Sequence, residues 1–242
     1  GTDVVVRLGM RYGEPSIKRA MAELKSEGCD RILVLPAYPQ YSGTTSASMY
    51  DACYAAAAAY RMVPALRFAA PFPDDPGYIE ALATRFKEAT MGFDFEHVIF
   101  SYHSIPIAYA KRGDPYATQC VWTSRALVKA LDLEQGHWNH CYQSIFGLDP
   151  WLGPQTDEVL KKLADQGVKK VAVICPGFLV DCLETIDEIG DVSTGLFLKA
   201  GGQELRLVPC LNDHPQWLRA MAAIVERETQ GWREPKRSLE VV

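Results

Sequence analysis

The chain has 242 residues, of which 48% are hydrophobic and 23% charged, and its formal net charge is −5. A chain of this length buries about 70% of the surface that its unfolded form exposes, so one large or two modest globular units are expected without a metal or disulfide staple. Lys and Arg are scattered through the sequence. This argues against a nucleic-acid-binding protein and favours a small-molecule partner.

The cysteines form an odd-numbered set with no C-x-x-C pair. Such usage is typical of a reduced cytoplasmic protein without disulfides. The sequence has no run of 18 or more apolar residues and no signal-peptide pattern at its start, so we expect no membrane span and no export. Peripheral contact with a membrane stays open.

Short β-rich runs alternate with helix-period segments along the whole chain, which is typical of βαβ units and a mostly parallel sheet. The predicted strands are residues 4–8, 31–35, 66–69, 98–102, 139–143, 170–175 and 205–208. The predicted helices lie around 17–24, 46–60, 79–86, 115–131, 156–164, 181–199 and 215–228.

Two segments repeat one plan of Gly and Pro, a helix, a second Gly, a basic residue, an apolar strand and a closing Pro. One runs from Gly13 to Pro36 and the other from Gly153 to Pro176. We therefore predict an α/β fold of two similar halves, whose loops at the carboxyl ends of the strands face a common cleft. The proline-rich stretch near 71–76 places the domains at 1–75 and 76–242. Whether the C-terminal helix packs back on the first domain is left open.

A histidine follows the apolar strand around Val98, in the sequence from Ser101 to Pro106. Ligands of open parallel α/β sheets bind outside the carboxyl ends of the strands, and a neutral imidazole there can accept a proton or bind a metal. His103 is therefore the first candidate for a functional residue. The alternative is a structural histidine bonded to the backbone.

Four acids follow the strand at 170–175, and a helical period of 100° per residue would place them on one face. They are Asp181, Glu184, Glu188 and Asp191. An acidic stripe is usually a solvated face, but an imidazole and carboxylates at one edge could handle protons and a divalent cation. Aromatic residues also gather in the loops, where they either pack or form walls for a flat ligand. The sequence has no Gly-rich phosphate loop and no G-x-S-x-G elbow.

Several motifs, in order along nearly the whole chain, resemble those of ferrochelatases. They are Tyr38-Pro39-Gln40-Tyr41-Ser42, Ser101-Tyr102-His103-Ser104-Ile105-Pro106, Arg112-Gly113-Asp114-Pro115-Tyr116, Gln143-Ser144, the run from Pro150 to Glu158, and Pro176-Gly177-Phe178 with Asp181 to Thr185. The resemblance implies a chelatase-like α/β fold of two similar Rossmann-like domains, each a parallel sheet flanked by helices, with a cleft between them. It also implies an enzyme that inserts Fe(II) into protoporphyrin IX, releases two protons and forms protohaem, the last step of haem biosynthesis. Protoporphyrin IX and Fe(II) would be its substrates, with no permanently bound cofactor.

The resemblance also implies roles for individual residues. His103 and Glu184 would be catalytic and would face each other across the porphyrin, and Glu188 would be a second acid on a polar path. His103, Glu184 and Glu188 would meet the metal. The predicted porphyrin-binding residues are Tyr38, Tyr102, Ser104, Pro106 and Trp151.

The chain also departs from the family pattern. Relatives begin some tens of residues earlier, so we expect an amino-terminal segment to be lacking. Gly43 stands where cluster-bearing members have Cys, so no [2Fe–2S] cluster is expected; Val192 replaces a third acid, and Cys182 stands where some relatives have His. Alternative functions are metal insertion into coproporphyrin or another tetrapyrrole, and tetrapyrrole binding without turnover. A binding protein for an unrelated small ligand is the remaining alternative.

Overall fold

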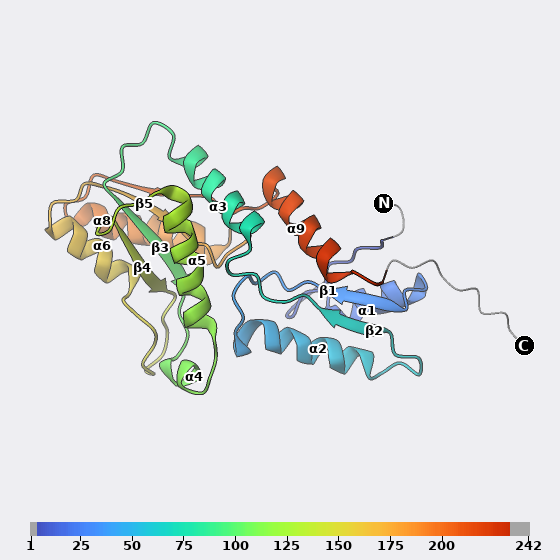
Figure 1. Cartoon of the computed structure of the whole chain (residues 1–242). Helices are drawn as coiled ribbons and strands as arrows, with labels where there is room; N and C mark the ends of the chain where they lie inside the picture. The colour runs from blue at the N-terminus through green and yellow to red at the C-terminus, as the bar shows by residue number, and fades with distance from the viewer. Residues whose placement is uncertain (1–3, 233–242) are drawn as a thin grey trace, which may run out of the picture. The chain divides into compact units, whose positions relative to one another are not determined.

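The computed structural model describes residues 4–232 and consists of alternating strands and helices (Figure 1). The first part contains α1 (Ile17–Ser26), β1 (Arg31–Val34), the π-helix η1 (Gly43–Ala47), α2 (Ser48–Ala57), β2 (Ala65–Phe68) and α3 (Pro76–Ala89). The middle contains β3 (His97–His103), α4 (Ile107–Lys111), α5 (Tyr116–Leu131) and β4 (Trp138–Gln143). The last part contains α6 (Thr156–Asp165), β5 (Lys170–Ile174), α7 (Leu183–Thr185), the π-helix η2 (Ile186–Ser193), α8 (Thr194–Lys199), β6 (Glu204–Leu207) and α9 (Pro215–Glu228).

The described chain divides into two compact units. The first unit contains residues 4–36, 44–70 and 221–232, and the second contains 37–43 and 71–220. The division between 70 and 71 lies close to the predicted domain boundary at 75/76. Two segments differ from the prediction: the C-terminal part of α9 belongs to the first unit, and the loop at 37–43 belongs to the second. The cleft between the domains stays a prediction.

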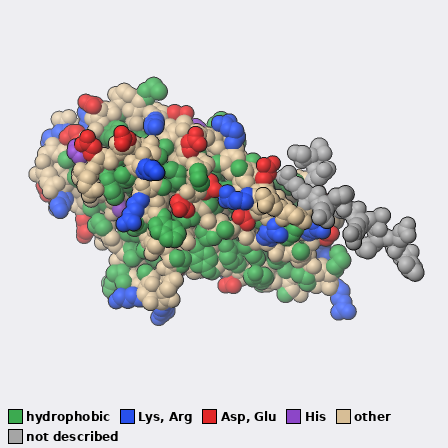
Figure 2. Space-filling model, in the orientation of Figure 1, with side chains coloured by type: hydrophobic (Ala, Val, Ile, Leu, Met, Phe, Trp, Pro, Cys, Tyr) green, Lys and Arg blue, Asp and Glu red, His purple; other side chains and the backbone are tan. Residues whose placement is uncertain are grey.

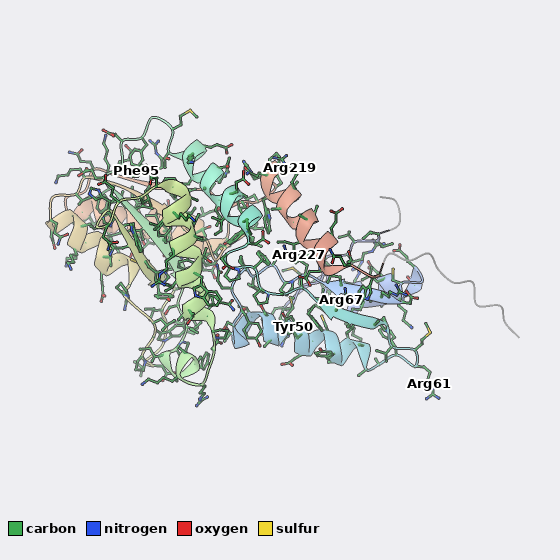
Figure 3. The ribbon with its side chains drawn as sticks, viewed as in Figure 1. Tyr50, Arg61, Arg67, Phe95, Arg219 and Arg227 are labelled. Atoms are coloured by element: carbon green, nitrogen blue, oxygen red, sulfur yellow. The ribbon has the colours of Figure 1, made fainter. Side chains whose placement is uncertain are left out.

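The first unit is built on the parallel pair β1 and β2, in which Arg31 is opposite Ala65. Ser16 caps the N-terminus of α1, and the apolar side of this helix packs with β1 and α2 around Met21, Ile32 and Cys53. At the end of α9, Arg67 of β2 donates to the carbonyl oxygen of Glu228, an orphan acceptor of the last helical turn (Figure 3).

The second unit contains a parallel sheet with the strand order β4-β3-β5-β6. Residues 97–102 of β3 are all buried, as expected for a central strand covered on both faces. Ile99 packs with Leu160 of α6 and Phe197 of α8, whereas the hydroxyl of Tyr102 lies 2.9 Å from that of Ser124 on α5. Side chains of β3 therefore alternate between two layers of helices.

The repeat predicted from the sequence is present in the structure. Both copies begin with a cis peptide bond before proline, Glu14–Pro15 in one and Gly153–Pro154 in the other. In each copy the proline carbonyl accepts from a preceding backbone N–H, at 2.7 Å from Met10 and 2.9 Å from Tyr142. Each copy then continues as helix, strand, loop, π-helix, helix and strand, and the second copy has the short helix α7 before its π-helix.

Two local predictions were wrong, and one short helix was missed. Residues 4–8 are not a strand, because they pair with no other strand among the described residues and leave Val6 and Leu8 exposed. The predicted helix at 181–199 is interrupted: it begins at 183 and contains η2, whose bonding pattern differs from that of an α-helix. The short helix α4 was not expected.

The surface agrees with the charge pattern of the sequence. On the face shown in Figure 2, basic and acidic side chains are interspersed rather than gathered by sign. Within residues 4–232, no helix is both long and apolar enough to cross a membrane. All seven cysteines are free thiols.

Candidate active site

His103 is the last residue of β3, at the carboxyl edge of the sheet in the second unit. Its Nδ1 lies 2.6 Å from the carbonyl oxygen of Ser104. A carbonyl oxygen can only accept a hydrogen bond, so Nδ1 carries the hydrogen. In the neutral ring Nε2 then holds the lone pair, which makes it the atom that can accept a proton or bind a metal.

Gln143 connects His103 to the acidic segment. It is paired with His103 across β3 and β4, and its side chain is 4% exposed. Its Nε2 donates to the carbonyl oxygen of Glu184 at 2.6 Å, while its Oε1 accepts from the hydroxyl of Ser101 at 2.7 Å. A buried amide whose donor and acceptor are both used holds its neighbours in one arrangement. The start of the acidic segment is therefore tied to the end of β4.

Glu188 is held by the next residue, Ser144. Its Oε1 accepts from the backbone N–H of Ser144 at 2.6 Å, and its Oε2 accepts from the Ser144 hydroxyl at 2.5 Å. Ser144 has φ of 60°, which is uncommon for a residue with a Cβ. Such conformations persist where the surroundings determine them, and here this conformation accompanies two hydrogen bonds to one carboxylate.

A small polar pocket of about 120 Å³ adjoins this carboxylate. Its lining residues come from the end of β4, the start of α6 and η2: Tyr142, Gln143, Ser144, Ile145, Gln155, Thr156, Asp157 and Glu188. His103 and Glu184 are not among them. The structure thus brings Glu188 to a pocket with polar walls, and it brings Glu184 to the same strand end through its backbone.

The predicted ladder of four acids is not a single helical face. Asp181 lies before α7, where its carboxylate accepts from Asn212 Nδ2 at 2.7 Å and from the Cys210 N–H at 3.0 Å. Burial alone would raise the pKa of Asp181, but these bonds outweigh burial and lower it. Asp181 is therefore a structural carboxylate that joins two loops. Asp191 lies on η2 and is exposed.

Cys182 is close to the Glu184 side chain. Burial and the neighbouring Glu184 carboxylate raise the pKa of the Cys182 thiol, because both disfavour a thiolate. Cys182 also caps α7, where its backbone N–H donates to the Thr185 hydroxyl at 3.0 Å. The thiol at this position is thus a protonated neighbour of Glu184.

The predicted porphyrin-binding residues differ in exposure. Tyr38 is 38% exposed, whereas Tyr102 is buried and its ring stacks on that of His140 at 4.9 Å. Ser104 is buried and donates to the carbonyl oxygen of Leu152, and Pro106 forms a bridge with Trp151. The binding role of each residue stays a prediction.

His103, Glu184 and Glu188 do not form a ready-made metal site. Within residues 4–232, no group of three or more His, Cys, Asp and Glu side chains is arranged to hold a metal ion. The predicted contacts of these three residues with iron therefore stay predictions.

Sequence reasoning gave no separate role to Gln143 and Ser144, which the structure places at the centre of the site. The signal in the sequence was the pair Gln143-Ser144 at the end of a predicted strand. Its meaning depends on two tertiary facts, the register of β4 with β3 and the left-handed backbone at Ser144.

Comparisons with known proteins agree with these features. A family model described as Ferrochelatase matches residues 1–229. A ferrochelatase of Nitrosococcus oceani is 45% identical over 238 residues, covering 97% of this chain and 64% of that protein. A ferrochelatase of a Polaromonas species is 45% identical over 233 residues, covering 96% and 64%. The chain thus spans slightly less than two thirds of the length of these curated relatives.

Solved structures share the fold. SirB from Bacillus subtilis, determined with Fe³⁺, has a TM-score of 0.67 at 17% identity, covering 94% of this chain and 84% of SirB. The sirohydrochlorin chelatase SirB from Bacillus subtilis subspecies spizizenii, in complex with cobalt, has a TM-score of 0.63 at 18% identity, covering 92% and 80%. At these identities the likeness concerns the fold, and it confirms the chelatase-like α/β class.

Proposed function

This chain belongs to the ferrochelatase family, and from that premise we propose that the intact protein inserts Fe(II) into protoporphyrin IX to form protohaem. The observation that carries the proposal is the arrangement at the carboxyl edge of the second unit. There, the Nδ1–H of His103 is used by a backbone carbonyl, and the strand partner of His103, Gln143, bonds to the acidic segment.

The proposed chemistry is an exchange of protons for a metal ion. Metallation breaks two pyrrole N–H bonds, and the electron pairs left on the nitrogens bind Fe(II). No electron transfer is needed, and two protons leave. His103 Nε2 has the lone pair that can accept one of them.

The second proton is assigned to the carboxylates. Glu184 would accept it and Glu188 would pass it on, because Glu188 adjoins the polar pocket. Ser144 holds both oxygens of Glu188, so this carboxylate does not need to reorient before it acts. Apolar contacts with the macrocycle, for which Tyr38 and Trp151 are proposed, would supply the binding energy that offsets distortion of the ring.

We also propose that Fe(II) is a substrate and that the protein holds no resident cofactor and no iron–sulfur cluster. Its partners would be the porphyrin and the ferrous ion, without nucleic acid. A cytoplasmic location is proposed from the seven free thiols, and peripheral membrane contact would bring the enzyme to an apolar substrate.

The experiment uses the intact protein under anaerobic conditions with Fe(II) and protoporphyrin IX. The Soret band should shift to that of protohaem, and His103→Ala should lower the rate by at least about 100-fold. His137→Ala is the matched control, because His137 is exposed and should leave the rate unchanged. No shift with the intact wild-type protein would refute the proposal.

The same assay separates the alternative functions. Faster metallation of coproporphyrin than of protoporphyrin would reassign the substrate. Tight porphyrin binding, seen by fluorescence, without metallation of any ring would instead indicate a binding module.

A further inference from the structure

The loop at residues 37–43, called here the Tyr38 loop, is attached to α5 by side chains of that helix and of the turn before it. The backbone N–H of Tyr41 donates to Gln119 Oε1 at 2.7 Å. Gln40 Nε2 donates to the hydroxyl of Thr123 at 2.8 Å, and both residues are at most 2% exposed. Gln119 and Thr123 are four residues apart, so they lie on one side of α5.

Asp114 holds the far end of the same loop. Its Oδ2 accepts from the hydroxyl of Ser42 at 2.9 Å and from the backbone N–H of Gly43 at 2.8 Å. Its Oδ1 accepts from the backbone N–H of Tyr116 at 3.0 Å, which fixes the carboxylate at the start of α5. One carboxylate therefore joins the loop to the helix, through charge-assisted bonds that are stronger than neutral ones.

The loop is placed at the same sheet edge as His103. A Cβ added at Gly177, in the loop after β5, would lie 3.5 Å from Gln40 Oε1 and 3.4 Å from the ring of Tyr102. Gln40 thus packs where β3 and β5 end. These are ordinary van der Waals distances, so Gln40 packs close to the loop after β5 and beside the strand end that presents His103.

From these contacts we propose that Asp114, Gln119 and Thr123 are positioning residues that hold the Tyr38 loop as one wall of the tetrapyrrole site. The proposal rests on the proposed function, since it takes the flat ligand from there. The three residues act through the loop and do not touch the substrate. A loop fixed before binding loses little conformational freedom on binding, so the anchors raise affinity for the porphyrin and leave the chemical step alone.

The main variant is Gln119→Leu, which keeps the size of the side chain and removes the acceptor for Tyr41. We expect the KM for porphyrin to rise about tenfold, with kcat changed less than about threefold, because the half-buried N–H of Tyr41 loses this acceptor and the loop loses one of its attachments to α5. Gln119→Glu keeps an acceptor and should restore most of the affinity. A second pair is Thr123→Val, which should act in the same direction, and Thr90→Val, a matched control in which a buried threonine loses a bond to the carbonyl of Phe86.

A readout that needs no activity is amide hydrogen exchange in residues 37–43. Exchange at Tyr41 should become faster in Gln119→Leu and stay unchanged in Thr90→Val. Unchanged exchange in Gln119→Leu would overturn the proposal, and so would faster exchange with an unchanged KM. If the wild-type protein binds porphyrin but inserts no iron, the proposed function fails, and the exchange rates with the porphyrin Kd still decide the role of the anchors.

Discussion

The two copies of the internal repeat have the same backbone plan and different chemistry. Each has a cis-proline, a helix, a strand, a loop and a π-helix, in the same order. The first copy ends its loop with amides, hydroxyls and aromatic rings in the sequence Tyr38-Pro39-Gln40-Tyr41-Ser42. The corresponding loop of the second copy is Phe178-Leu179-Val180-Asp181-Cys182, and the acids Glu184 and Glu188 follow it in α7 and η2.

This difference separates what the scaffold does from what the side chains do. The repeated plan delivers a loop and a π-helix to the carboxyl end of a strand in each copy. Which chemistry appears there depends on a few residues, because function resides in sites placed on a common fold. In the proposed enzyme, one copy would build a wall for the ring and the other would handle protons and metal.

The largest expected effect is on the free energy of unfolding, when a core residue of each copy is replaced by alanine. Leu160 of α6 and Met21 of α1 stand at the same distance from their cis-prolines, and both are buried. Leu160→Ala should lower the free energy of unfolding by about 4 kcal/mol and Met21→Ala by about 2 kcal/mol. The difference is expected because the hydrophobic cluster around Leu160 is larger, so its side chains move less to fill the cavity. Urea denaturation measures both. The reverse order would show that the first copy has the more tightly packed core.

The next effect concerns the acids of the second copy. Glu188→Ala would remove the carboxylate and leave the N–H and hydroxyl of Ser144 without this acceptor. The rate of iron insertion should fall about 100-fold, or about 2.7 kcal/mol. The control is Asp187→Asn, the exposed neighbour on η2, which should retain the wild-type rate. A similar loss in both variants would point to the charge of η2 rather than to Glu188.

The smallest effect concerns the segment between the copies, which contains most of the histidines. Burial lowers the pKa of His140 to about 4. An unfolded chain titrates histidine near 6.5, so between these values the unfolded state binds more protons and stability falls as the pH falls. When the pH is lowered from 7 to 5, the free energy of unfolding falls in the wild type, and in His140→Phe it should fall by about 2 kcal/mol less. His137→Gln, at an exposed site, should lose as much as the wild type.

Periodicity and composition were sufficient for much of the fold. The apolar runs at 98–102 and 170–175 became β3 and β5, because continuous apolar stretches suit strands buried on both faces. Local pattern failed at residues 4–8, where a β-rich run predicts a strand but no strand within residues 4–232 pairs with it. A β-strand forms only when a neighbouring strand supplies hydrogen bonds, and the sequence of one segment does not show whether such a neighbour exists.

The site was predictable in its residue types more than in its connections. His103 follows from its position after an apolar strand, and Glu184 and Glu188 follow from their place after the apolar strand at 170–175. The π-helix changed which acids belong together, and Asp181 proved to be a loop anchor. A spacing of 100° per residue assumes an α-helix, so it places side chains wrongly where the chain forms a π-helix with a different rotation per residue.

The division of α9 has a consequence for synthesis. The first unit contains residues 4–36 and 44–70 but also 221–232, and Arg67 bonds to the carbonyl of Glu228. A ribosome releases the chain from its amino end, so residues 71–220 can fold while the first unit still lacks its last segment. The first unit is therefore completed after the second, when residues 221–232 arrive and Arg67 gains its bond to the carbonyl of Glu228.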